Sequence, residues 1–174
     1  STENFVRRGP HGLYPMKNGQ RIIKLKGDSY EIGWQHGKFL AKEIRRVTDS
    51  TLYLVGLVYS IKKGKWFFNE IRSALARLDK FTPKEYLEEM RGVADGSGID
   101  YERVHMANYF PALFHCSGFT LKDTATKDGR LYHGRILDYM CEVGLQYNAV
   151  LFAVEKKGKI PFANVSFASF IGSV

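Results

Sequence analysis

Three side chains have types and spacing that would suit a nucleophilic site. Cys116 stands at the head of a strand-like run, and Arg135 and Asp138 follow on a second run. An arginine near a cysteine favours the thiolate over the thiol, and the thiolate is the form that attacks a carbonyl carbon. The alternative is a buried structural cysteine beside an ordinary ion pair, because free cysteine is among the most buried side chains.

The two runs are predicted to pair as a β-hairpin, which would bring these side chains together. Asp128-Gly129 lies between them, and Asp-Gly supplies the positive φ angles that a two-residue turn needs. Side chains alternate between the faces of a strand, so Arg135 and Asp138 would lie on opposite faces of a regular strand. If both residues serve one site, we expect Asp138 to lie past the regular end of the strand.

Upstream of Pro111 the sequence has mainly helical patterns. Asp28 and Glu31 form a capping-box pattern at the start of one helix, and Thr82-Pro83 with Glu85 forms another at the start of a second. We expect Thr82 to be the cap of that second helix. The first helix carries apolar residues with helical spacing, namely Ile32, Phe39, Leu40, Ile44 and Val47.

Further signals set the remaining elements of this part. The second helix is predicted to end near Gly96 or Gly98, since glycine adopts the left-handed conformation that closes helices. A short helix is expected over residues 100–108. A strand over residues 20–25 follows the turn signal Asn18-Gly19.

Downstream of Pro111 the pattern changes to strands. The runs cover residues 116–121, 131–137, 149–155 and 162–170. Glycine-containing turns separate them, which is typical of an antiparallel meander. We therefore predict an α+β fold with two regions, a mainly helical one over residues 1–115 and a β region over residues 116–174.

Three blocks of the chain resemble, in the same order, motifs of the isopenicillin N acyltransferase family. That family belongs to the N-terminal nucleophile (Ntn) hydrolases, with acid ceramidase and bile-salt hydrolases. The blocks are residues 27–37 (Gly-Asp-Ser-Tyr-Glu-Ile-Gly-Trp-Gln-His-Gly), residues 86–100 (Tyr-Leu-Glu-Glu-Met-Arg-Gly-Val-Ala-Asp-Gly-Ser-Gly-Ile-Asp) and the segment from Cys116 to Asp138. Three blocks in register make a more specific signal than any one of them.

The resemblance implies an αββα sandwich that is made as a precursor and cuts itself before its nucleophile. Cys116 would then be the exposed nucleophile, and its new α-amino group would be the base. Such an amine titrates at roughly pH 8, so an appreciable fraction is free at neutral pH. Residues 1–115 would form the pro-region and residues 116–174 the first strands of the core. The rest of the fold is expected in a further segment or in a second chain from the same precursor.

The resemblance also implies a function. The protein would be a hydrolase or acyltransferase that cleaves a linear amide bond, in a small molecule or a lipid, through a thioester on Cys116. Arg135 would hold the thiolate and the substrate electrostatically, and Asp138 would orient the α-amine or the arginine. No cofactor and no metal is required.

Two alternatives stay open. A maturation cut after Val174 would make the following residue the nucleophile, and Cys116 would then have a structural or auxiliary role. The chain would otherwise be a catalytically silent module that binds a partner or a lipid surface. A papain-like pair between Cys116 and His133 is disfavoured, because such a cysteine begins a helix rather than a strand.

The amino-acid composition and charge of the chain limit which classes of partner are expected. The chain has 174 residues, 44% of them hydrophobic, so it has enough apolar material for a core. Its formal net charge of +8 would suit nucleic acid or an anionic membrane surface. The basic residues are scattered, however, and no Walker, Rossmann or zinc-finger pattern occurs, so nucleic acid is not expected as a partner.

Residues 52–68 form an apolar and aromatic run with lysines near its end. Such a run is typical of a helix on a lipid surface and also of an internal helix packed on a sheet, and both interpretations stay open. No run reaches the roughly 18 apolar residues of a membrane span. The sequence does not distinguish a cytoplasmic protein from an exported one whose leader has been removed.

Overall fold

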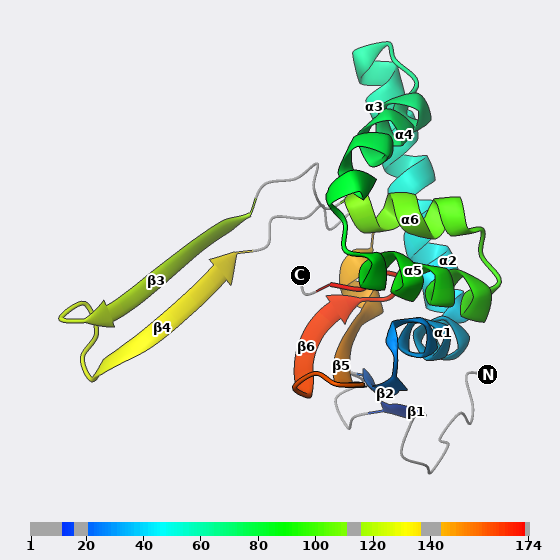
Figure 1. Ribbon diagram of the computed structural model, residues 1–174. Coiled ribbons are helices and arrows are strands. Elements are labelled where there is room, and N and C mark those ends of the chain that lie inside the picture. Colours follow the sequence, from blue (N-terminus) through cyan, green and yellow to red (C-terminus); the bar gives the residue numbers. More distant parts are fainter. Residues whose placement is uncertain (1–11, 16–20, 111–115, 137–143, 173–174) are drawn as a thin grey trace.

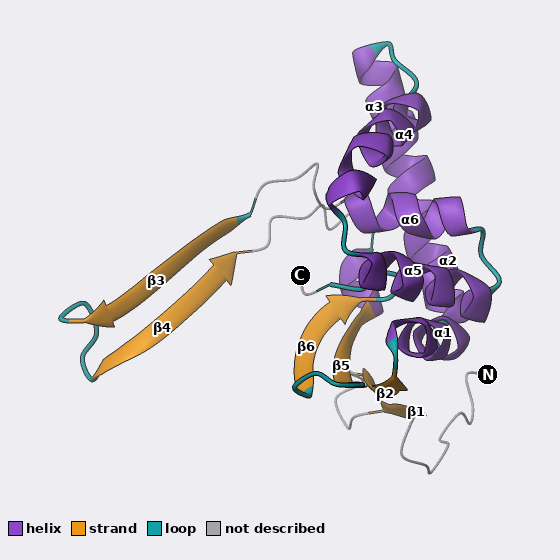
Figure 2. Cartoon of the chain, in the orientation of Figure 1, coloured by secondary structure: helices purple, strands orange, loops and turns teal. Residues whose placement is uncertain are grey.

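The computed structural model is a mixture of helices and strands, and it describes residues 12–15, 21–110, 116–136 and 144–172 (Figure 1). Helices cover one face of a sheet, and a hairpin stands apart from that body (Figure 2). The mixture agrees with the predicted α+β class. The turn expected at Asn18-Gly19 lies outside the described residues.

The described α-helices all come before residue 111, as expected. They are α1 (Ser29–Phe39), α2 (Ala41–Asp49), α3 (Gly56–Lys63), α4 (Phe67–Leu78), α5 (Lys84–Ser97) and α6 (Tyr101–Tyr109). A π-helical turn, Ser50–Val55, joins α2 to α3, and a 3₁₀ turn, Asp79–Phe81, follows α4. A further 3₁₀ turn, Leu145–Asn148, precedes β5 (Ala149–Lys156).

The described strands form one four-stranded sheet and one hairpin. They are β1 (Gly12–Pro15), β2 (Arg21–Gly27), β3 (Ser117–Asp123), β4 (Gly129–Ile136), β5 (Ala149–Lys156) and β6 (Phe162–Phe167). The sheet has the order β1-β2-β5-β6, in which β2 and β5 run parallel, and β3 pairs with β4 in the hairpin.

The prediction of a single antiparallel meander is wrong. Among the described strands, β5 lies beside β2 and not beside β4. The burial pattern gives the reason, because Val150, Phe152 and Val154 alternate on one face of β5 and match the buried Ile23 and Leu25 of β2. A parallel pair needs a long crossover, and the helices between β2 and β5 are part of it.

One of the two predicted caps is confirmed. The backbone N–H of Glu31 donates to Asp28 Oδ1 (2.9 Å), and the Asp28 N–H donates to Glu31 Oε2 (2.9 Å), which completes the capping box of α1. The helix ends sooner than its apolar pattern suggests, because Leu40 leaves the helical conformation between α1 and α2. Gly98, at φ 69°, closes α5 as expected.

Thr82 is not the cap of α5, so that prediction is wrong. Its hydroxyl donates to the carbonyl oxygen of Leu78 (3.1 Å) and also contacts the Tyr109 hydroxyl. Pro83 is the cap residue in its place. The hydroxyl therefore serves the preceding turn and the contact with α6 rather than the start of α5.

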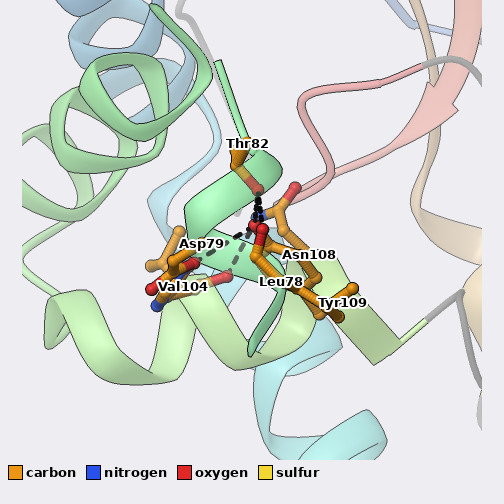
Figure 3. Close-up of polar contacts among 7 residues, drawn as sticks. Leu78, Asp79, Thr82, Val104, Asn108 and Tyr109 are labelled. Atoms are coloured by element: carbon orange, nitrogen blue, oxygen red, sulfur yellow. Dashed lines mark hydrogen bonds and ion pairs between the residues drawn. The ribbon is translucent and has the colours of Figure 1, made fainter. Parts of the chain in front are cut away.

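A polar cluster fixes α6 against that preceding turn (Figure 3). Asp79 Oδ1 accepts a hydrogen bond from the Tyr109 hydroxyl (3.2 Å) and lies 2.9 Å from His105 Nε2. Asn108, on the same helix, donates to the carbonyl oxygen of Ser169 (2.8 Å) and accepts from the N–H of Ile171 (2.9 Å). The bonds of Asn108 join α6 to the segment after β6. The contact with Asp79 gives His105 a structural role.

Helices α1 and α5 pack with their backbones in close contact. The side-chain position of each of four glycines is filled by the backbone of the facing helix. The glycines are Gly33 and Gly37 on α1, and Gly92 and Gly96 on α5. The main core then lies between these helices and the inner face of the sheet, where Ile23, Ile32, Val93 and Val150 are buried.

Candidate functional site

The hairpin places Cys116 and Arg135 on one face. Gly118 lies opposite Arg135, and Thr120 lies opposite His133. Directly opposed residues share a face, and residues two positions apart on a strand share it too. Cys116, two residues before Gly118, is therefore on the side of the hairpin that carries Arg135.

The side-chain geometry agrees with that register. Arg135 Nη2 lies 3.6 Å from Cys116 Sγ, within the range of a hydrogen bond to sulfur. Cys116 is a free thiol, and both side chains are exposed. Solvent weakens the electrostatic attraction between two groups that are both exposed. The structure thus brings two of the three predicted site residues together.

This face is polar near Cys116, whereas Leu131, farther along β4, is 68% exposed on the same face. Thr120 Oγ1 lies 2.9 Å from His133 Nδ1, so the ring of His133 has Thr120 as its hydrogen-bond partner. Gly118, between Thr120 and Cys116, leaves the floor of this face open, since the nearest atom to its missing side chain is a carbonyl oxygen at 3.6 Å. A ligand could therefore lie across the hairpin beside Cys116.

The opposite face of the hairpin is apolar. It carries Phe119, Leu121, Tyr132 and Ile136, which are between 42% and 54% exposed. The ring of Phe119 covers Gly134, directly across the ladder. The hairpin therefore has one face that carries Cys116 and Arg135 and an opposite face that is apolar.

The connection between the two strands is wider than the predicted two-residue turn. Strand β3 extends to Asp123, with φ of 53°, and β4 begins at Gly129, with φ of 69°. Thr126 Oγ1 donates to the carbonyl oxygens of Asp123 (3.1 Å) and Arg130 (3.0 Å), which closes the wider loop. The hairpin itself is confirmed, whereas the two-residue turn at Asp128-Gly129 is wrong.

Asp138 lies outside the described residues, as does the second cysteine, Cys141. The role expected for Asp138 stays a prediction. Within the part of the chain that the structure describes, no group of three or more His, Cys, Asp or Glu side chains is arranged to hold a metal ion.

A second titratable cluster, between α5 and the sheet, has no counterpart in the predicted site. Lys156 Nζ lies 2.9 Å from Glu85 Oε2 and 3.7 Å from Glu89 Oε2. Burial raises the pKa of the Glu89 carboxyl to about 7, against the opposing effect of Lys156. Contact with Lys156 lowers the pKa of Glu85. These residues come from distant parts of the sequence, so no local motif points to the cluster.

His36 lies beside this cluster. It is buried, its Nε2 accepts a hydrogen bond from the N–H of Ser169 (3.3 Å), and its ring packs on Phe152. Burial lowers the pKa of His36 to about 3, so the ring is neutral at physiological pH. His36 and Glu89 line a cavity of about 20 Å³, which has room for about one water molecule.

Comparisons with known proteins give distant relatives. An uncharacterized protein of Archaeoglobus fulgidus is 27% identical over 199 residues, covering 95% of this chain and 32% of that protein. Protein dcd1A of Dictyostelium discoideum is 29% identical over 187 residues, or 92% of this chain and 42% of that protein. The N-acylethanolamine-hydrolyzing acid amidase of Rattus norvegicus is 26% identical over 119 residues, or 68% of this chain and 32% of the amidase.

No family model matches the chain. The chain spans about a third to two fifths of the length of these relatives. The resemblance to an amide-cleaving family is therefore supported at the level of distant and partial homology to an acid amidase.

Proposed function

We propose that this chain is the cysteine-bearing part of an Ntn-type amide hydrolase or acyltransferase. The observation that carries the proposal is the 3.6 Å contact between Arg135 Nη2 and Cys116 Sγ on the polar face of the hairpin. The distant homology to an acid amidase supports amide cleavage as the reaction. Cys116 is the nucleophile, and Arg135 stabilises its thiolate and the developing charge on the substrate.

The reaction has two stages. The thiolate attacks the amide carbonyl, a C–S bond forms, and collapse of the tetrahedral intermediate breaks the C–N bond. The amine leaves with a proton, which the α-amino group of mature Cys116 took from the thiol. Water or an acceptor amine then attacks the thioester, so the acyl group leaves and the thiol is restored. No step requires a cofactor.

Maturation and assembly are part of the proposal. The peptide bond before Cys116 is cut to free its α-amine, and Asp138 orients that amine or Arg135. A second chain from the same precursor completes the αββα sandwich. The apolar face of the hairpin supports this assembly. An isolated two-stranded hairpin is only marginally stable, so it needs such a cover. The outer face of the sheet is mixed, since Val165 is 57% exposed there and the ion pair between Lys26 and Glu155 lies on the same face.

The test is the intact mass and N-terminal sequence of every chain in the purified full-length protein. Wild type should yield a chain that starts at Cys116, whereas Cys116→Ala should stay uncut and inactive on an acyl-amide panel. Cys141→Ala is the matched control and should be cut normally.

Other outcomes would replace the proposal. A chain that starts just after Val174, with residues 1–174 intact, would move the nucleophile to that next residue. Normal turnover by Cys116→Ala would also exclude Cys116. An uncut protein that forms no thioester with any amide would favour the catalytically silent module.

A lipid surface is a second candidate partner, favoured by an apolar side shared by α3 and the π-helical turn before it. Leu54, Leu57, Val58 and Ile61 follow helical spacing and are between 45% and 74% exposed. The expectation of an internal helix packed on the sheet is wrong, since α3 and α4 project away from the sheet (Figure 1). Lysines at the end of α3 would contact anionic headgroups. Among the described residues, no helix has the length and apolarity to span a bilayer.

A further inference from the structure

The strand register of the hairpin decides whether Arg135 meets Cys116. A slip of one residue would move Arg135 to the opposite face, because side chains alternate along a strand. Burial usually fixes register, yet every residue of β3 is exposed, and so is nearly all of β4. The loop acts at the far end of the hairpin, and a register shift between Leu121 and Asp123 separates it from the paired residues near Cys116. The register therefore needs a local device.

Phe119 and Gly134 form such a device on the opposite face. They pair directly across the ladder, and the Phe119 ring occupies the space that a side chain at position 134 would fill. A Cβ added at Gly134 would lie too close to three atoms of the Phe119 ring, within 3.1 Å of each. Gly134 is also the residue immediately before Arg135. An aromatic ring over a cross-strand glycine restores the packing that glycine lacks.

We propose that Phe119 and Gly134 are positioning residues that set the strand register and so hold Arg135 against Cys116. The inference rests on the proposed function, because it gives a purpose to the contact between Cys116 and Arg135. A one-residue slip would place Phe119 opposite a residue with a side chain and would also break the Thr120–His133 hydrogen bond. The aligned register is therefore the one in which both pairs are satisfied.

The experiment measures how strongly Cys116 prefers an anionic alkylating reagent. Peptide mass spectrometry gives the rates with iodoacetate and with neutral iodoacetamide at Cys116, in the purified full-length protein at low salt. The ratio of the two rates reports positive charge near Sγ, because a change in thiol exposure alters both rates alike. Arg135→Gln should lower this ratio by about twofold to fivefold, the range for an exposed charge pair.

The positioning variants should lower the ratio as far as Arg135→Gln does. Phe119→Ala removes the ring, and Gly134→Ala forces it aside. Phe119→Tyr keeps the ring and should keep the wild-type ratio. Leu121→Ala is the matched control, since Leu121 lies on the same face and is also about half exposed, and it should leave the ratio unchanged.

The double variant sharpens the result. If the ring fills the place of the missing side chain, Phe119→Ala with Gly134→Ala should lower the ratio no further than Phe119→Ala alone. A wild-type ratio in both single variants, with a lowered ratio in Arg135→Gln, would overturn the positioning role and leave the proposed function standing. A wild-type ratio in Arg135→Gln would instead remove the Arg135–Cys116 pairing on which the proposed function depends.

Discussion

Four glycines in two of the sequence blocks that resemble Ntn hydrolases have a structural role, because they allow α1 and α5 to pack closely. Gly33 and Gly37 come from the first block, and Gly92 and Gly96 come from the second. In each case the facing backbone, not a side chain, occupies the space beside the glycine. Spacing of four residues puts both glycines of a helix on one side, so the two helices approach along a shared stripe. Helical periodicity of apolar residues alone does not reveal this contact.

Gly92→Ala should therefore destabilise the chain strongly. Its Cβ would overlap the carbonyl oxygen of Tyr30, which is backbone and cannot rotate away. We expect a loss of about 2–3 kcal/mol, typical of overpacking, in the free energy of unfolding from urea titration. Gly172→Ala is the control, because nothing lies within 4 Å of that position. Equal stability of the two variants would contradict the close approach of α1 and α5.

The candidate site was predictable where the chemistry is local. Arg135 lies in β4 and Cys116 immediately precedes the partner strand β3, and alternation predicts which residues of a strand share a face. The hydroxyl of Thr82 was not predictable, because its partner Tyr109 is distant in the sequence. The two-residue turn predicted at Asp128-Gly129 was wrong because Thr126 stabilises a wider loop than the dipeptide suggests.

At the level of elements, the positions of strands followed from sequence but their partners did not. Local patterns found β2, β5 and β6 close to their observed bounds. Pairing depends on which faces can be buried together. The buried face of β5 continues the buried face of β2, although the helices separate the two strands in the sequence. Sequence order therefore suggested a hairpin-to-hairpin meander, whereas burial selected the parallel neighbour.

The contact between α5 and the sheet should make stability depend on pH. The pKa of Glu89 is about 7 in the folded chain and ordinarily 4.5, so the folded state binds this proton more tightly than the unfolded state. The free energy of unfolding contributed by Glu89 therefore falls as pH rises from about 4.5 to 7. The buried His36 acts in the opposite direction, because its low pKa means that stability is lost as pH falls below 6.5.

Glu89→Gln should isolate the Glu89 contribution, since His36 is present in both proteins. Between pH 5 and pH 8, wild type should lose on the order of 2 kcal/mol relative to Glu89→Gln in urea unfolding. Glu88→Gln is the matched control, because Glu88 is exposed and forms an ion pair with Lys84, four residues earlier on α5. Parallel pH profiles for wild type and Glu89→Gln would contradict the buried, protonatable state of Glu89.

For the whole molecule, the projecting tip formed by α3 and α4 should govern lipid binding. Burying Leu57 and Ile61 in a bilayer surface would contribute a few kcal/mol, so Leu57→Glu with Ile61→Glu should weaken sedimentation with phosphatidylserine vesicles by roughly tenfold or more. Added salt should weaken wild-type binding as well. Ile160→Glu is the control, since Ile160 is 86% exposed in the turn before β6. Equal sedimentation of the double variant and wild type would remove the tip as a lipid-binding surface.

The outer face of the sheet should show whether the described body is complete in itself. Val165 on β6 is 57% exposed there, whereas Val150 on β5 is 2% exposed on the inner face, against the helices. If a second sheet normally covers the outer face, the 174-residue chain alone should self-associate through it. Val165→Lys should then reduce association in light scattering and change the free energy of unfolding by less than about 1 kcal/mol.

Val150→Lys tests the opposite face of the same sheet. It buries a charge in the core, so it should cost about 3 kcal/mol or more and unfold the chain at a lower temperature. The contrast between the two lysines distinguishes a covered face from an uncovered one. A wild-type chain that stays monomeric at high concentration, or a Val165→Lys variant as unstable as Val150→Lys, would show that the outer face needs no second sheet. Either result would contradict the proposed two-chain sandwich.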